Sequence, residues 1–307
     1  MYKRQVHATL DKNILNTLTA VDYSIQREGE EATLALVENK DPTKIPGVVS
    51  RGRNGLINNG IAPIIKDIDN LLRDRGKPVS CLSRHIFAGM TAQNRPGDTL
   101  HNKHMDALKR VVEMAHIVES PFVRIMTQKK EQILWGFNGA EKWNVAHGAW
   151  DTMAPMIEPA VEFARSAGVK LAVETGNGTM VNSNYTARKL IDELNAKDTL
   201  KVLWDPGNNC WCHELAFPDG YEEVRGGYLG HIHIKDVLVD TPKATLTVKE
   251  MGEGQLGPLF NPMAAALRKD QYGGVISYES VYHPGNGNFE DGFRKCIDKF
   301  KKIFGEV

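Results

Sequence analysis

The 307-residue sequence has few cysteines, no net charge and no long apolar segment. Its four cysteines are too few and too scattered for a disulfide framework, which indicates reduced thiols. Lys and Arg together number 38, as do Asp and Glu, and this balance argues against nucleic-acid binding by a broad basic surface. No apolar run approaches the roughly 18 to 20 residues of a membrane helix, and the N-terminus lacks the apolar core of a signal peptide. We therefore expect a cytoplasmic protein with no nucleic-acid or membrane partner.

Several chemistry-bearing motifs are also missing. The GNGT segment at 176–179 is not part of a G-x-G-x-x-G dinucleotide fingerprint, and neither a phosphate loop of the G-x-x-x-x-G-K-[ST] type nor a G-x-S-x-G elbow occurs. Cys210, Cys212 and His213 form a C-x-C-H cluster, but it lacks the second half of a structural zinc site. We interpret this cluster as structural.

From Pro78 onward, short Val- and Ile-rich segments alternate with amphipathic ones. The expected strands are 79–87, 122–127, 169–176, 200–208, 230–236 and 273–280, and the expected helices are 104–119, 154–167, 185–195, 214–224, 262–269 and 289–304. Such alternation predicts a parallel sheet covered by helices, in the α/β class. A closed (β/α)8 TIM barrel needs two further strands from the first 78 residues. We therefore expect a barrel over 79–307 and an atypical or incomplete N-terminal portion over 1–78.

The first 78 residues leave two interpretations open. Residues 21–25 and 48–51 would supply the two missing strands, whereas GVVSRGRNGLINNG, at 47–60, favours a β-hairpin that turns at Arg53-Asn54-Gly55. Residues 20–70 also resemble the end of a cobalamin-binding domain joined to a radical-SAM linker, without the C-x-x-x-C-x-x-C and D-x-H-x-x-G motifs of those proteins. This resemblance implies a truncated or spliced N-terminus; the alternative is a divergent first quarter of a normal barrel.

Four of the expected strands end in a residue that binds metals in other proteins. The segments LAVETG, KVLWDPGN, HIHIKD and VISYES supply Glu174, Asp205, His233 and Glu279, separated by 31, 28 and 46 residues. One strand with its return helix takes about 30 residues or more, so these side chains fall at the same end of successive parallel strands. In a TIM barrel that end carries the active site.

Three carboxylates and one imidazole form a donor set for a single divalent ion. Mn²⁺ is our first choice, and Mg²⁺, Co²⁺, Fe²⁺ and Zn²⁺ also fit this chemistry. Such an ion can hold two neighbouring oxygens of a sugar and stabilise an enediolate. Glu174 and Glu279 would then flank the substrate carbon, one removing a proton and the other returning it, which makes them catalytic residues as well as ligands.

Four further residues are candidate substrate contacts. His231 precedes the histidine ligand by two and points to the same side of its strand, although a buried core histidine is the alternative. Lys235 would bind a substrate hydroxyl, carboxylate or phosphate, or form a structural pair with Asp236. His85 would contact a sugar hydroxyl at the barrel mouth. Asn208, three residues after the aspartate ligand, can donate and accept hydrogen bonds.

These motifs, in this order, resemble the xylose-isomerase-like TIM-barrel superfamily over residues 79–307. CLSRHIF is similar to the third-strand segment of hexulose-phosphate 3-epimerases, MGEGQLG to a Gly-Glu-Gly loop after the seventh strand, and the four strand-end residues fall on the family's metal ligands. The resemblance implies a metal-dependent isomerase or epimerase acting on a sugar or sugar phosphate. It also implies assembly into homo-oligomers.

Three alternatives remain open at this point. A lyase that cleaves keto-glycosides would use the same metal and bases. An endonuclease-IV-type repair enzyme is disfavoured by the neutral charge and by Asn208, since some relatives place a further histidine ligand there. A barrel without its first two strands would have open edges and need a partner, with no enzymatic activity.

Overall fold

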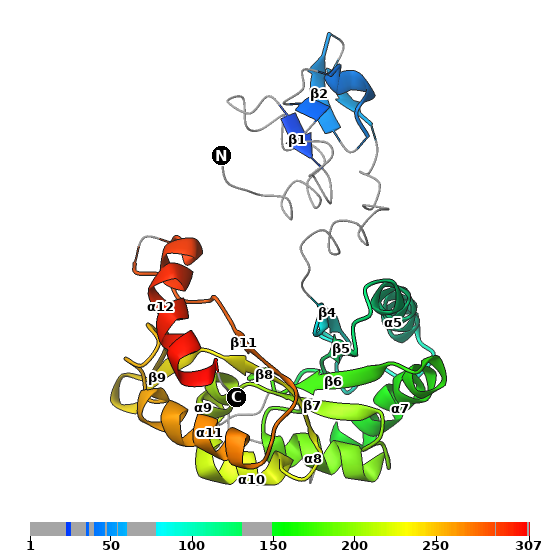
Figure 1. Ribbon diagram of the computed structural model, residues 1–307. Coiled ribbons are helices and arrows are strands. Elements are labelled where there is room, and N and C mark those ends of the chain that lie inside the picture. Colours follow the sequence, from blue (N-terminus) through cyan, green and yellow to red (C-terminus); the bar gives the residue numbers. More distant parts are fainter. Residues whose placement is uncertain are drawn as a thin grey trace. The chain divides into compact units, whose positions relative to one another are not determined.

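The chain divides into two compact units, residues 1–77 and residues 78–307. The structure is a computed structural model that describes residues 23–25, 35–36, 40–46, 48–53, 55–59, 78–130, 149–285, 287–305 and 307. The sequence also predicts helices at 30–39 and 63–75, but apart from residues 35–36 these segments lie outside the described residues. Figure 1 shows the secondary structure of each unit.

In the first unit, the described strands form an antiparallel sheet in the order β1 (Tyr23–Ile25), β2 (Val48–Gly52) and β3 (Gly55–Asn58). The 3-10 helix η1 (Pro42–Lys44) comes directly before β2 in the chain. Gly52 faces Gly55 across the β2–β3 hairpin, which confirms the hairpin expected there. Gly55 has φ of +125°, a conformation that side chains with a Cβ rarely adopt. Among its described residues, the first unit is therefore an antiparallel sheet.

The second unit is built on six parallel strands that pair in chain order. They are β4 (Leu82–Ile86), β5 (Phe122–Ile125), β6 (Lys170–Glu174), β7 (Leu200–Trp204), β8 (Leu229–Ile234) and β11 (Val275–Tyr278). All six strands expected after residue 78 are confirmed. Within the described residues, β4 and β11 each have a strand neighbour on one side only, so the sheet is a half-barrel. The expectation of an incomplete barrel therefore also holds.

Helices cover the outer side of this sheet (Figure 1). They are α5 (Thr99–Ile117), α7 (Ala149–Ala167), α8 (Asn184–Glu193), α9 (Pro206–Trp211), η2 (Ala216–Gly220), α10 (Tyr221–Val224), α11 (Gly257–Lys269) and α12 (Phe289–Phe304). Their apolar faces join the strands in one continuous core that runs from Ile86 to Phe304. None of the described helices combines the length and the apolar character that a membrane crossing requires.

The alternation of side chains along each strand separates the core from the inner face. In β6, Leu171 and Val173 belong to the helix-covered core, whereas Glu174 points the other way. In β8, Ile232 and Ile234 are core residues, and His231 and His233 occupy the alternate positions. Since successive strand residues face opposite sides, the inner face of the half-barrel is the polar one.

One structural element was missed by the sequence interpretation. The segment between β8 and α11, expected as a long loop, contains an antiparallel hairpin of β9 (Asp236–Asp240) and β10 (Thr245–Lys249), joined through the 3-10 helix η3 (Thr241–Lys243). Asp236, expected as the partner of Lys235, instead accepts hydrogen bonds from the backbone N–H groups of Val237, Gly252, Gly254 and Leu256, at 2.8 to 3.1 Å. It therefore anchors the MGEGQLG loop.

The N-terminus of α5 leads to a prediction about pH. Asp98 caps this helix by accepting a hydrogen bond from the N–H of His101 at 2.7 Å, and this bond, with those from Asn94 and Arg95, lowers the pKa of Asp98 to about 2. The unfolded value is about 3.9, so the contribution of Asp98 to stability is complete above that pH and is lost as the pH falls through 2. Urea unfolding between pH 5 and 2 should show a shallower decline for Asp98→Asn, which keeps a cap but does not titrate. An unchanged profile would contradict this assignment.

Candidate metal centre

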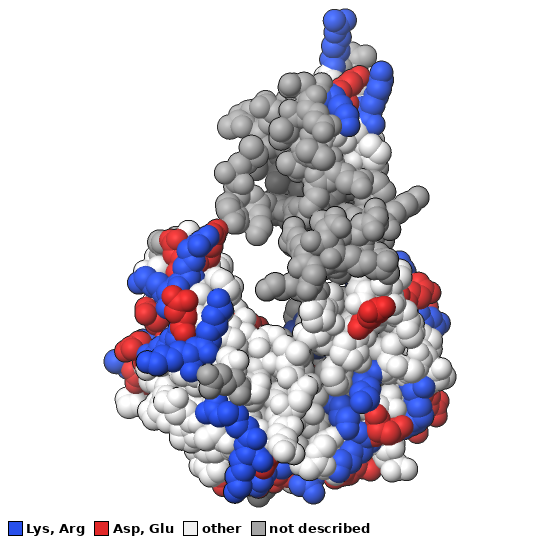
Figure 2. All heavy atoms as spheres, in the orientation of Figure 1, with Lys and Arg blue, Asp and Glu red and all other residues white. Residues whose placement is uncertain are grey.

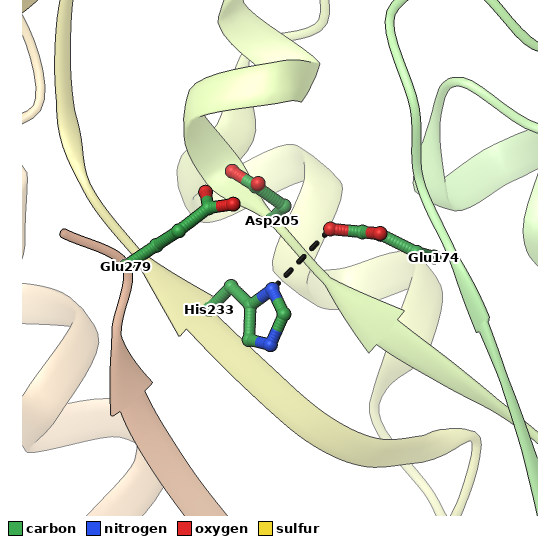
Figure 3. Close-up of side chains that lie close together, drawn as sticks. All are labelled: Glu174, Asp205, His233 and Glu279. Carbon is green, nitrogen blue, oxygen red and sulfur yellow. Dashed lines mark hydrogen bonds and ion pairs between the residues drawn. The ribbon is translucent and has the colours of Figure 1, made fainter. Parts of the chain in front are cut away.

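Four side chains from four neighbouring strands converge on the inner face of the half-barrel. Glu174 ends β6, Asp205 directly follows β7, His233 lies in β8 and Glu279 directly follows β11. Each offers one potential ligand atom, and these atoms all lie within 4.8 Å of one another. Figure 3 shows the four side chains pointing toward one another, with His233 Nδ1 3.3 Å from Glu174 Oε1. The structure thus brings together all four residues that the sequence indicated as metal ligands.

The local sequence around Asp205 explains how it is held. Asp205 has an extended backbone and is the N-cap of α9, where its Oδ1 accepts a hydrogen bond from the N–H of Asn208 at 3.0 Å. Pro206 occupies the first helical position, where a missing N–H costs nothing. The WDPGN segment therefore ends a strand, begins a helix and leaves the second carboxylate oxygen directed at the cluster.

Glu174 is buried between two basic side chains. Its Oε2 accepts a hydrogen bond from Arg124 Nη1 at 2.6 Å, and its Oε1 faces the ring of His233. Burial by itself raises the pKa of Glu174, but His233, Arg124 and Lys235 together bring it below the ordinary value. Glu174 is therefore ionised at neutral pH, the form that binds a metal or accepts a proton.

Asp205 and Glu279 share one lysine. Lys235 Nζ lies 2.5 Å from Asp205 Oδ2 and 2.6 Å from Glu279 Oε2, and its side chain is only 5% exposed. Burial and the neighbouring carboxylates of Glu279 and Glu174 raise the pKa of Asp205 despite this ammonium. Burial would lower the pKa of Lys235, but the two carboxylates that it contacts raise it above its usual range. Lys235, expected as a substrate contact, is thus hydrogen-bonded to two of the metal-ligand candidates.

His231 lies beneath His233 on the same strand. The two rings meet edge to face with centroids 5.4 Å apart, and His231 Nε2 is 3.0 Å from the hydroxyl of Ser277. Burial, followed by the charge of His233, lowers the pKa of His231 to about 4, so its ring is neutral at physiological pH. His231 is placed to support the ring of His233.

The two remaining substrate candidates lie at the border of the cluster. The imidazole of His85, on β4, is 3.4 Å from Arg124 Nη2 and so connects to Glu174 through the arginine. Asn208 donates through its side-chain Nδ2 to the carbonyl of Thr175 at 2.8 Å, which ties α9 to the loop after β6. Their roles in substrate binding stay predictions.

Two residues of the site were missed by the sequence interpretation. Arg124 is a buried cation inside the otherwise apolar strand FVRI, and that break in the apolar pattern is the signal that could have revealed it. Trp211 ends α9, and the centre of its ring lies 5.4 Å from Lys235 Nζ. No described residue accepts a hydrogen bond from the indole N–H of Trp211.

Three carboxylates and one imidazole at this spacing could hold a divalent metal ion. Glu174, Asp205, His233 and Glu279 would be the residues that hold it, since their ligand atoms all lie within 4.8 Å of one another. Among the described residues, no other group of three or more His, Cys, Asp or Glu side chains lies close enough together to hold an ion.

Comparison with known proteins now identifies the family. The model of the xylose isomerase-like TIM barrel matches residues 51–303. The chain belongs to this family. A search of curated proteins finds no match.

Solved structures of xylose isomerase-like barrels share the fold. The IOLI protein with a bound zinc atom has a TM-score of 0.60 at 16% identity, with 79% of this chain and 83% of that chain covered. The 3-keto-D-glucoside 4-epimerase of E. coli has a TM-score of 0.57 at 18% identity, with 78% of this chain and 84% of that chain covered. A D-tagatose 3-epimerase-like protein has a TM-score of 0.58 at 18% identity, with 79% of this chain and 85% of that chain covered. At these identities the likeness establishes the fold.

The family match also corrects one expectation from the sequence. Residues 20–70 are not borne out as a cobalamin-binding and radical-SAM fragment, since the barrel family already matches from residue 51. The strands Val48–Gly52 and Gly55–Asn58 instead pair as an antiparallel hairpin. Whether residues 1–78 complete the barrel stays a prediction.

Proposed function

We propose that this protein is a divalent-metal-dependent isomerase or epimerase of sugars or sugar phosphates. One observation carries the proposal: Glu174, Asp205, His233 and Glu279 come from four adjacent strands and place their ligand atoms within 4.8 Å of one another. Three carboxylates and one imidazole would hold the ion, with Mn²⁺ as the preferred metal. A divalent ion bound there would polarise the substrate carbonyl and stabilise the negative charge that develops when the neighbouring C–H proton leaves.

The protein's own contribution is proton transfer by two carboxylates on either side of the cluster. Glu174 comes from β6 and Glu279 from β11, the outer two of the four strands, with the other two ligands between them (Figure 3). One glutamate would take the proton from the carbon beside the carbonyl, and the other would return a proton to the enediolate. Return to the same carbon from the opposite face inverts it, which is epimerisation, and return to the neighbouring carbon isomerises the ketose.

Arg124 supports this role by fixing the carboxylate of Glu174. The guanidinium bonds one oxygen of Glu174 and contacts His85, so it orients the glutamate and keeps it ionised. The proposed substrate contacts are His85, Asn208, His231 and Lys235. A sugar substrate is further supported by two of the fold relatives, whose names describe them as acting on a keto-glucoside or as resembling a tagatose epimerase.

The surface offers no support for the repair-enzyme alternative. Figure 2 shows Lys and Arg interspersed with Asp and Glu over the face in view. On α12, Arg294 pairs with Glu290 and Lys295 with Glu250. A protein that binds DNA through its backbone instead gathers basic side chains on one face. The formal net charge of zero points the same way.

Exchange of substrate protons with solvent tests the proposal. Protein stripped with EDTA and then supplied with Mn²⁺ is incubated in D₂O with a panel of ketoses, ketose phosphates and 3-keto-glycosides, and NMR follows deuterium at the carbons beside the carbonyl. We expect deuterium at one such carbon of at least one class, with the epimer or isomer as product, and a return to background when EDTA is added again. Release of the aglycone from a keto-glycoside would identify the lyase reaction instead. Absence of exchange across all three classes, in protein that has bound Mn²⁺, would overturn the proposal.

A further inference from the structure

The buried ammonium of Lys235 occupies two of the four candidate metal ligands. Lys235 Nζ donates hydrogen bonds to Asp205 Oδ2 and Glu279 Oε2, at 2.5 and 2.6 Å. Asp205 is completely buried, and Glu279 is about one-third exposed. The lysine therefore supplies the positive charge that these two carboxylates need when no metal is bound.

Both carboxylate oxygens of Asp205 already accept a hydrogen bond. Its Oδ1 accepts the one from the N–H of Asn208 that caps α9, and its Oδ2 accepts the one from Lys235. An ion that binds Asp205 through Oδ2, the oxygen directed at the cluster, therefore meets the ammonium of Lys235. We propose that Lys235 is the resident cation of the metal-free site, and that a divalent ion binds only by displacing its ammonium from Asp205 and Glu279. This inference rests on the proposed metal-dependent function.

The charges of the cluster support such an exchange. The three carboxyl groups of Glu174, Asp205 and Glu279 face two basic side chains, Arg124 and Lys235, so the formal charges of the cluster differ by one. An ammonium and a divalent ion bound to the same oxygens would lie only a few ångströms apart, and their repulsion in a buried site is strong. One cation therefore replaces the other.

The chain also makes room for the lysine at Gly207. A Cβ at this position would come within 2.8 Å of Lys235 Cγ and 3.0 Å of Cε, so the side chain runs directly over a glycine of α9. Trp211, one turn further along the helix, has its ring 5.4 Å from the ammonium. The side chain of Lys235 therefore packs along α9, between Gly207 and Trp211, and its ammonium reaches the carboxylates. Once displaced, the ammonium becomes available to an oxygen of the substrate, which makes metal binding a precondition for the substrate contact of Lys235.

Metal affinity in a lysine variant tests the displacement. Lys235→Met keeps the length of the side chain and removes its charge. In calorimetric titrations of EDTA-treated protein with Mn²⁺, we expect Lys235→Met to bind at least about tenfold more tightly than the wild type, because the ion no longer competes with an ammonium. Its melting temperature without metal should fall, and saturating Mn²⁺ should restore most of the difference. Lys201→Met is the matched control, since Lys201 lies on β7 and bonds the carbonyl of Gly227 instead of the cluster.

Chemical labelling of the wild type provides a second measurement that needs no variant. Reductive methylation followed by peptide mass spectrometry compares the reactivity of each lysine with EDTA and with saturating Mn²⁺. Lys235 should be protected without metal and react several-fold faster with it, while the reactivity of Lys201 stays constant. This result decides the question even where Lys235→Met fails to fold without metal.

The two experiments separate this inference from the proposed function. If the wild type binds Mn²⁺, but Lys235→Met binds it equally or less tightly and labelling of Lys235 is unchanged by the ion, the displacement is overturned and the metal site stands. Tight binding by Lys235→Met and weak binding by the wild type supports the displacement. If neither protein binds Mn²⁺, both proposals are overturned.

Discussion

Replacing Glu174 and Glu279 together by glutamine should remove the bound metal and abolish solvent exchange into the substrate. The double variant withdraws two of the three carboxylates from the cluster and both of the proposed proton-transfer groups. A positioned acid or base contributes about 10² to 10⁴ in rate, so the loss of two of them with the metal should lower exchange by at least about 10⁴. Metal content by mass spectrometry should fall from about one Mn²⁺ per wild-type chain to none.

The same variant should keep its fold. Glutamine has the shape of glutamate, and its carbonyl oxygen still accepts a hydrogen bond from Arg124, while Lys235 retains the carboxylate of Asp205. Circular dichroism and the melting temperature check this directly. Glu162→Gln, an exposed carboxylate on α7, is the matched control and should leave metal content and exchange at the wild-type level. Full metal content in a folded double variant would refute the assignment of these ligands.

The positions of the four ligand candidates were predictable because they follow from chain geometry alone. A strand that ends in a parallel sheet presents its next residue at the same edge as its neighbours, and a return connection of about 30 residues or more brings the chain back to that edge. Glu174, Asp205, His233 and Glu279 satisfy both conditions, and the structure brings them together. The alternation within HIHIKD likewise predicted that His231 and His233 lie on one side of the strand.

The partners of these ligands could not be predicted in the same way. Whether Arg124 reaches Glu174 on the next strand, and whether Lys235 bends toward Asp205 instead of pointing into the mouth, depends on the conformations of long side chains. Strand spacing does not determine those conformations. Burial decides them, because a carboxylate withdrawn from water requires a counter-charge, and the nearest cations supply it.

Closure of the barrel was the part of the fold that the sequence left open. The six strands after Pro78 carry dense apolar patterns and were all found, whereas the turn-rich residues 47–60 favoured a hairpin over a barrel strand, and the structure agrees. The β9–β10 hairpin was missed although its strands contain alternating apolar residues such as Val237 and Val239. The sequence TPKA between its two arms is longer than the two-residue turns that signal a hairpin most clearly.

Asp236→Ala should destabilise the second unit by about 3 to 4 kcal/mol, the largest effect expected from a residue outside the metal cluster. Asp236 is 1% exposed, and its carboxylate accepts four backbone hydrogen bonds, three of them from the 252–256 segment of the MGEGQLG loop. Alanine leaves these N–H groups without their acceptor, at a cost of about 1 to 3 kcal/mol for each one that stays buried. Because the loop can move and expose some of them to water, the total stays well below the sum. Urea unfolding at neutral pH measures the loss.

Gly254 shows why this loop has little freedom to adapt. A Cβ at this position would lie 2.3 Å from Asp236 Oδ1 and 2.5 Å from the carbonyl of Val237, so the loop backbone rests directly on the carboxylate. Gly254→Ala should therefore destabilise the protein through the same contact, and its effect should shrink in an Asp236→Ala background because the opposing side chain is gone. Asp240→Ala is the matched control: Asp240 lies on the same strand in an exposed pair with Lys243, and its loss should cost less than about 1 kcal/mol. Equal losses for Asp236→Ala and Asp240→Ala would show that the buried carboxylate does not organise the loop.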